Sequence, residues 1–139
     1  MKLKHYLITA LIIFTACEKT DDTIIANETL MIGTWLQTET SVSVGGPQYW
    51  VDVEEGESLM FFENGTFSSN RFTECTEGNF SIIDQELHLD YNCDQFSTEY
   101  HNEDGIITYD LNFKSSYFIL TPTSGLICVE GCKSKYQKI

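Results

Sequence analysis

Positive charge is scarce in this sequence. Lysine and arginine together number 8, against 21 aspartates and glutamates, and the formal net charge is −13. A strongly acidic surface repels phosphate backbones, so the composition argues against nucleic acid as a partner. The same charge would suit a basic protein partner, and it also serves plain solubility.

The sequence also lacks the motifs that commonly carry catalysis. No serine lies in a Gly-x-Ser-x-Gly elbow, and neither a glycine-rich phosphate loop nor a metalloprotease helix occurs. His88 and His101 have no second histidine at metal-ligand spacing. The acidic run from Asp52 to Glu57 lacks the alternating oxygen ligands of a calcium loop, so we interpret it as a solvated strand end. We therefore predict that the protein is not an enzyme and uses no metal or cofactor.

Long apolar runs are absent too. The longest, Tyr6–Phe14, is too short to cross about 30 Å of hydrocarbon as a stable helix. It follows two lysines and precedes two small residues and Cys17. A charged start, a short apolar run and small residues at its end predict a secretory signal peptide, here residues 1–16.

The end of this segment, F-T-A-C, resembles the lipobox of bacterial lipoproteins, with Phe14 where leucine is usual. The resemblance implies diacylation of Cys17, cleavage before it and then N-acylation, and several acyl chains hold a protein stably on a membrane. The alternative is a signal peptide that is cut elsewhere. Cleavage before Cys17 removes two lysines, which takes the net charge from −13 to −15.

Residues 17–30 are then the acylated cysteine and a polar, flexible tether. Asp21-Asp22 resembles the acidic export tags that some Gram-negative bacteria place behind the acylated cysteine. We therefore expect an outer-membrane lipoprotein in the cell envelope of a Gram-negative bacterium, facing either the periplasm or the cell surface.

The remaining residues, 31–139, form one domain of strands and turns. No window holds an apolar stripe at helical spacing, and turn signals recur about every 8 to 12 residues. Short connections make neighbouring strands antiparallel, and such a sheet avoids exposed edges by closing. We therefore predict an all-β fold, an antiparallel up-and-down β-barrel of about eight strands. The expected strands cover residues 32–44, 48–54, 58–62, 66–72, 77–83, 86–91, 106–113, 117–121 and 126–138, with 96–101 as a further short strand.

The turn at Asn64-Gly65 fixes the register of one hairpin. A three-residue turn with Gly65 in the left-handed conformation places Phe61 opposite Phe67, whereas a two-residue turn places Phe62 there. We favour the three-residue turn, because Leu59, Phe61 and Phe67 then share one face of the sheet.

Four cysteines remain after the acylated one, and in an exported domain they predict two disulfides. In the hairpin that turns at residues 84 and 85, Cys75 and Cys93 are one position out of register, which a single bulge absorbs. We therefore predict a Cys75–Cys93 disulfide, whose closure stabilises the fold by roughly 3 kcal/mol.

Cys128 and Cys132 are then paired by exclusion, across a turn that Gly131 permits. The alternative is a redox or zinc site. Redox motifs usually place two residues between their cysteines and this pair is separated by three, so we favour the structural disulfide.

The first strand opens with Gly33-Thr34-Trp35. A Gly-x-Trp motif before a run of antiparallel strands resembles the lipocalin-like domains of small bacterial lipoproteins, and Leu59–Phe67 resembles their third and fourth strands. The resemblance implies a structural role for Trp35, which plugs one barrel end while Gly33 lets the backbone pass close. In secreted lipocalins an arginine often packs on this tryptophan, but Arg71, the only arginine here, comes too early in the chain.

Two functions fit these observations. The first, which the resemblance implies, is a lipid-anchored module whose barrel holds a small hydrophobic molecule. The alternative is a protein-interaction or inhibitor module with a filled barrel that acts through its acidic surface and loops. Trp50 shares a strand face with Asp52, so it would either form an exposed patch or cap the core at the barrel mouth. The candidates for a ligand site or surface patch are Tyr49, Trp50, Phe61 and Phe67.

Overall fold

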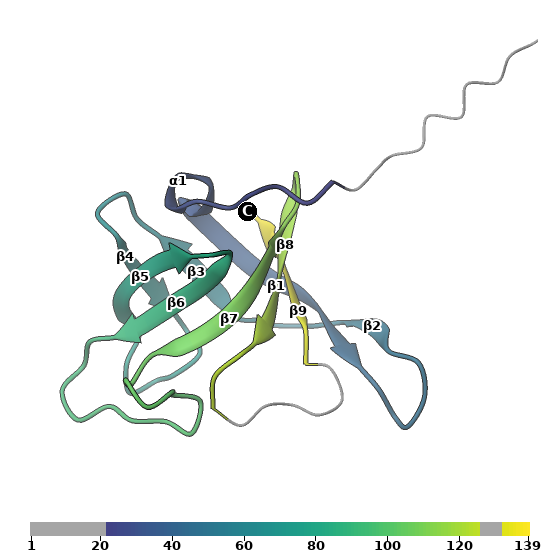
Figure 1. Cartoon of the computed structure of the whole chain (residues 1–139). Coiled ribbons are helices and arrows are strands. Elements are labelled where there is room, and N and C mark those ends of the chain that lie inside the picture. The colour runs from purple at the N-terminus through teal and green to yellow at the C-terminus, as the bar shows by residue number, and fades with distance from the viewer. Residues whose placement is uncertain (1–21, 126–131) are drawn as a thin grey trace, which may run out of the picture.

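The structure is a computed structural model that describes residues 22–125 and 132–139 (Figure 1). Within these residues it contains one short helix and nine strands. The elements are α1 (Glu28–Met31), β1 (Gly33–Val42), β2 (Tyr49–Asp52), β3 (Ser58–Phe61), β4 (Thr66–Ser69), β5 (Glu77–Ile83), β6 (Glu86–Tyr91), β7 (Ile107–Phe113), β8 (Tyr117–Pro122) and β9 (Ser134–Lys138).

The strands form one antiparallel sheet that closes into a barrel. Sequential strands pair from β3 through β9, and β1 pairs with both β3 and β9, so eight strands make the barrel wall. The predicted all-β, up-and-down barrel is therefore confirmed. β2 pairs with the second half of β1, where Glu39–Val42 lie opposite Tyr49–Asp52. We call this hairpin, residues 39–52, the β1–β2 arm; it extends to the side of the barrel in Figure 1.

The two hairpins whose register we predicted have that register. Phe61 lies opposite Phe67, and Gly65 has a φ of +81°. The strands β5 and β6 turn at Asp84 and Gln85, whose φ values are +50° and +65°. Positive φ at both turn residues gives a two-residue loop the twist that suits the flanking strands.

Two predicted strands differ from the structure. Residues 96–101 form turns, in which the Phe96 amide donates to the Cys93 carbonyl at 3.2 Å and the His101 amide to Thr98 at 3.2 Å. The aromatic residues of this segment cover the end of the barrel, and that packing, rather than strand alternation, explains their spacing. The last strand begins at Ser134 rather than at residue 126, and residues 126–131 lie outside the described part.

The chain contacts the barrel from Thr23, earlier than residue 30, where we expected the flexible tether to end, and the Thr23 hydroxyl accepts from the Lys114 ammonium at 2.9 Å. The Ile24 amide donates to the Phe113 carbonyl at 2.8 Å. Ala26 is buried, and its amide donates to the Gln85 side chain at 2.8 Å. The Asn27 side chain then caps α1 by accepting from the Leu30 amide at 3.1 Å. The sequence does not predict these contacts, because they involve only a few side chains within a mostly polar stretch.

Trp35 is buried beneath α1. Its indole nitrogen donates to the Met31 carbonyl at 2.7 Å, and its ring lies 4.7 Å from that of Phe118. Gly33 has a φ of +126°, and a Cβ there would lie 2.7 Å from Cε of Lys138. The Lys138 ammonium in turn lies 5.3 Å from the Trp35 ring centre, within cation–π range. The cation on this tryptophan is therefore a lysine of the last strand.

Aromatic rings fill the described part of the interior. Phe61 contacts Phe80 with ring centres 4.7 Å apart, and Phe67 meets Tyr91 edge to face at 5.0 Å. Such pairs stabilise by about 0.5–1.5 kcal/mol beyond their buried area. Further buried apolar side chains between these rings are Leu59, Leu87, Leu89, Ile107, Leu111 and Leu120.

The two ends of the barrel differ in their connections. At one end, which we call the closed end, the short turns 62–65, 84–85 and 114–116 join the strands, and α1 lies beside them (Figure 1). At the other, the open end, the longer connections 70–76 and 92–106 join β4 to β5 and β6 to β7, and the connection 123–133 joins β8 to β9.

A disulfide links the connections 70–76 and 92–106 at the open end. Cys75 and Cys93 are bonded, with Cα atoms 5.8 Å apart, which confirms the predicted pair. Cys132 is also disulfide-bonded. Its predicted partner, Cys128, lies outside the described residues, and so does Cys17, the predicted acylation site.

Candidate functional site

The four candidate site residues fall into two separate places. Phe61 and Phe67 are almost completely buried in the barrel interior, where they belong to the core. Tyr49 and Trp50 lie on the β1–β2 arm with 49% and 37% of their surface exposed. The structure therefore makes the first pair part of the packing and leaves the second pair as the candidate surface site.

Trp50 lies on the outer face of the arm beside a cation. The Lys135 ammonium lies 5.3 Å from the Trp50 ring centre and 5.0 Å from that of Tyr117. Lys135 also forms an ion pair with Glu39, which holds the ammonium between the two rings. These contacts fix one side of the indole, so the exposed side is presented in a defined orientation.

The edge of β2 adds a second means of recognition. Among the described residues β2 pairs only with β1, so the outer edge of Tyr49–Asp52 carries backbone groups without a strand partner. An open strand edge is a ready template for an extended segment of another protein, with main-chain hydrogen bonds for affinity. Tyr49 and Trp50 would then supply pockets or platforms for its side chains.

Carboxylates surround this edge. Asp52 and Glu54 are exposed beside Trp50, and Glu55, also exposed, follows with a φ of +56°. Gly56 ends this bend: a Cβ there would lie 2.1 Å from the Gln37 carbonyl oxygen, so only glycine lets the chain pass so close to β1. Tyr49 and Trp50 therefore present one exposed aromatic ring on each face of the strand, with carboxylates at its Asp52 end, and this arrangement suits a basic segment.

A polar cluster lies at the open end of the barrel, and no motif in the sequence predicts it. Glu57 accepts hydrogen bonds from the Tyr136 hydroxyl at 2.7 Å and from the Ser69 hydroxyl at 2.8 Å. Arg71 lies 3.5 Å from the same carboxylate and donates to the Tyr109 hydroxyl at 3.1 Å. These partners come from four different segments, and no local motif could have revealed their meeting.

The cluster combines a partly buried ion pair, Arg71 with Glu57, with buried tyrosines. Burial raises the pKa of Tyr91 to about 12 and raises the pKa of Tyr109 and of Tyr136 above the ordinary tyrosine value. Burial alone would lower the pKa of Arg71, but Tyr109 and Glu57 beside it raise the pKa above its usual range. Arg71 thus stays charged, the tyrosines stay neutral, and the charge of Glu57 is compensated.

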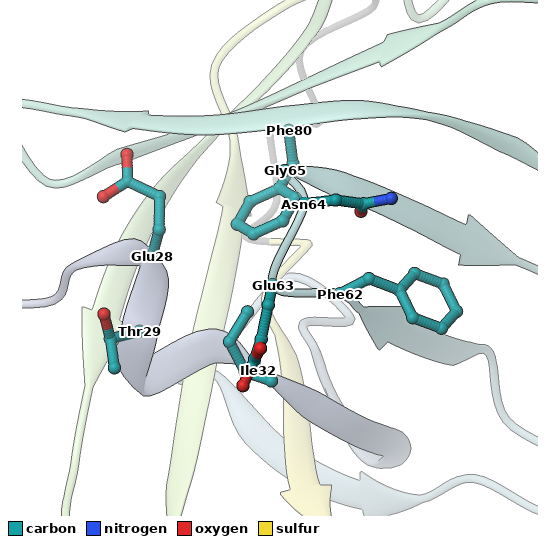
Figure 2. Close-up of a pocket in the computed structure, with 8 residues that line it drawn as sticks. All are labelled: Glu28, Thr29, Ile32, Phe62, Glu63, Asn64, Gly65 and Phe80. Carbon is teal, nitrogen blue, oxygen red and sulfur yellow. The ribbon is translucent and has the colours of Figure 1, made fainter.

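A groove of about 640 Å³ lies at the closed end, between α1 and the turn that joins β3 to β4 (Figure 2). Ile32 and Phe80 supply apolar lining, and in Figure 2 the Phe80 ring points into the gap while the Phe62 ring points outward. Glu28 and Glu63 stand on its rim, and the Glu28 carboxylate accepts from the Ile82 amide at 3.1 Å. Phe80, which lines the groove, also belongs to the hydrophobic core of the barrel.

The described residues contain neither a cluster of metal ligands nor a helix that could span a membrane. No three His, Cys, Asp or Glu side chains within residues 22–125 and 132–139 gather as metal ligands would. None of the helical structure in this part of the chain is long and apolar enough to span a bilayer.

The fold and its exposed arm define a small closed β-barrel with a candidate protein-binding hairpin. Comparison with known proteins adds no family: no family model, curated protein or solved structure matches this chain.

Proposed function

We propose that this protein is a lipid-anchored lipoprotein of a Gram-negative cell envelope, with a lipocalin-like barrel that binds a basic protein partner through the β1–β2 arm. In this proposal acyl chains on Cys17 hold the protein on the outer membrane, and the barrel is a scaffold rather than an enzyme. The observation that carries the proposal is an exposed tryptophan and tyrosine on an open-edged strand with an acidic rim.

The interior favours this proposal over a small hydrophobic ligand held in the barrel. The aromatic side chains of the interior pack ring against ring, and Phe61 and Phe67, which would have lined such a site, are almost completely buried. A filled barrel leaves its outer surface and loops for binding.

The surface of the arm has the composition of an interface centre. Tryptophan and tyrosine are enriched at protein interfaces, where they contribute a large share of the binding energy. The carboxylates around them would steer a basic partner and select against acidic ones. Binding of this kind weakens as salt screens the charges.

Capture of partners by the acylated protein tests the proposal. The immobilised protein is incubated with envelope extract of its native host, at low and at high salt, and bound proteins are identified by mass spectrometry. We expect a basic protein that is retained at low salt and released at high salt. The variant Trp50→Ala with Tyr49→Ala is expected to lose it.

Met60→Ala is the matched control, because Met60 is an exposed apolar side chain on the outer face of β3, away from the arm. It should retain the partner as the unchanged protein does. Equal capture by the arm variant and by the control, or capture that salt does not affect, would contradict the proposal.

A further inference from the structure

Exposed apolar side chains gather at the closed end of the barrel. Ile25 is 80% exposed, Ile83 is 52% exposed and Phe62 is 41% exposed, and Leu30 on α1 and the C-terminal Ile139 are exposed as well. These residues come from four segments, namely the N-terminal stretch with α1, two turns and the chain end. These segments come together only when the barrel folds, so the apolar surface is a feature of the folded protein.

The groove at the closed end continues this apolar surface. Ile32, Phe62 and Phe80 line it between α1 and the turn 62–65 (Figure 2). Within residues 22–125 and 132–139, the connections at the closed end are three short turns, and none of them is a long polar loop that could cover these side chains. The exposed apolar side chains would therefore be in direct contact with any partner or membrane at the closed end.

The anchored part of the chain joins the barrel at the same end. Ile24 is seven positions after Cys17 and pairs with Phe113 next to the turn 114–116, and the Thr23 hydroxyl before it accepts from the Lys114 ammonium at 2.9 Å. Seven residues span at most about 25 Å when fully extended. A lipid anchor on Cys17 would therefore keep the closed end, and not the open end, close to the bilayer.

The charged side chains are also distributed unevenly, and their distribution favours the closed end as the one nearer a membrane. At the closed end the acidic side chains Glu28, Glu63 and Asp84 are balanced in part by Lys114 and Lys138. Within the described residues, the connections 70–76 and 92–106 of the open end contain Arg71 as their one lysine or arginine, and Lys133 lies in the connection from β8 to β9 at the same end. The acidic side chains of 70–76 and 92–106 are Glu74, Asp94, Glu99, Glu103 and Asp104. An anionic headgroup layer would repel the open end more strongly.

We propose that the closed end is a membrane-contact surface, which rests on the bilayer with Ile25, Leu30, Phe62 and Ile83 in the headgroup region. Apolar side chains at this depth add binding energy in proportion to the area they bury. The proposal rests on the lipid anchor of the proposed function and adds an orientation to it. The open end, and the arm beside it, then point away from the membrane.

Fluorescence quenching by brominated lipid tests the orientation. Acylated Phe62→Trp and Val44→Trp proteins are reconstituted into phosphatidylcholine vesicles with and without brominated acyl chains. Val44 is the matched position, because it is an exposed apolar residue at the tip of the arm. Bromine quenches an indole on contact, so we expect a loss of emission from Phe62→Trp that Val44→Trp does not show. Trp35 and Trp50 give both proteins the same background.

A third protein checks the role of the other apolar residues. Adding Ile25→Asp and Leu30→Asp to Phe62→Trp changes two exposed positions, so the fold is preserved, and it should reduce the quenching at position 62. Equal quenching at positions 62 and 44, or quenching that the aspartates do not reduce, would overturn the orientation.

Flotation of the same vesicles separates the two proposals. Protein that floats with the vesicles but shows no difference between the positions refutes the contact surface and leaves the anchor intact. Protein that does not float refutes the lipid anchor, and the contact surface fails with it.

Discussion

The closed and open ends of this barrel are stabilised by different means. At the closed end, short turns bring the strands together and Trp35 packs between α1 and the rings of Phe113 and Phe118. At the open end, the connections are long, and a disulfide with a buried polar cluster holds them. Ring packing alone therefore fixes the closed end, whereas at the open end covalent and polar links add to the packing of Phe72, Tyr91 and Phe96 and hold long acidic loops in place.

The largest expected effect comes from comparing the two tryptophans. Trp35→Ala removes the indole that fills the closed end and its bond to Met31, and we expect a loss of about 3–5 kcal/mol in the free energy of unfolding. Trp50→Ala removes a partly exposed ring on the arm and should cost less than about 1 kcal/mol. Urea unfolding measures both, and similar losses would break the distinction between core and surface tryptophan.

The disulfide gives the next largest effect, at the open end. Replacing Cys75 and Cys93 by serine frees a loop with a sequence separation of 18 and should lower the free energy of unfolding by about 3 kcal/mol. Hydrogen exchange should then speed up in residues 92–106 but remain slow in β1 and β3. Faster exchange spread evenly over the barrel would show that the two ends are not independent.

A pair of tyrosines sharpens the account of the polar cluster. Tyr136→Phe removes a hydrogen bond to the buried Glu57 carboxylate and should cost about 2 kcal/mol. Tyr91→Phe is the control, because Tyr91 is a buried tyrosine of the same end whose hydroxyl makes no hydrogen bond to Glu57 in the described part of the chain. Its removal should be close to neutral. Equal losses for the two variants, measured by urea unfolding, would contradict the assigned hydrogen bond.

Alkaline pH should weaken the open end through the same tyrosines. Burial raises the folded-state pKa of Tyr91 from 10.0 to about 12, so its contribution to stability is complete below pH 10 and is lost as pH rises toward 12. At about pH 11 the loss from Tyr91 alone is roughly 1 kcal/mol. Tyrosinate absorbance and urea unfolding followed together should show it. Stability that is unchanged up to pH 12 would contradict the burial of these hydroxyls.

The sequence predicts the barrel well because its signals are local. Alternation, the Asn64-Gly65 turn and the Asp84-Gln85 turn fix hairpins one at a time, and the position of Cys93 opposite Cys75 follows from the second hairpin. Closure then follows from the need to cover strand edges. Each of these inferences uses residues close together in the chain.

The sequence fails where distant segments meet. Glu57, Arg71 and Tyr136 each look like an ordinary strand or loop residue, and only closure brings them together. Phe96 and Tyr100 imitate a strand because the rings that cover the barrel end have a similar spacing. Of the four candidates for a ligand site or surface patch, Tyr49 and Trp50 are exposed, whereas Phe61 and Phe67 belong to the core.

Photocrosslinking in living cells tests most directly whether the two ends face different surroundings. A photoreactive benzoylphenylalanine is placed at position 62 on the closed end or at position 44 on the arm, and the adducts are identified by mass spectrometry. We expect phospholipid adducts from position 62 and protein adducts from position 44. Phospholipid adducts from both positions, or protein adducts from position 62 with none from position 44, would contradict the account.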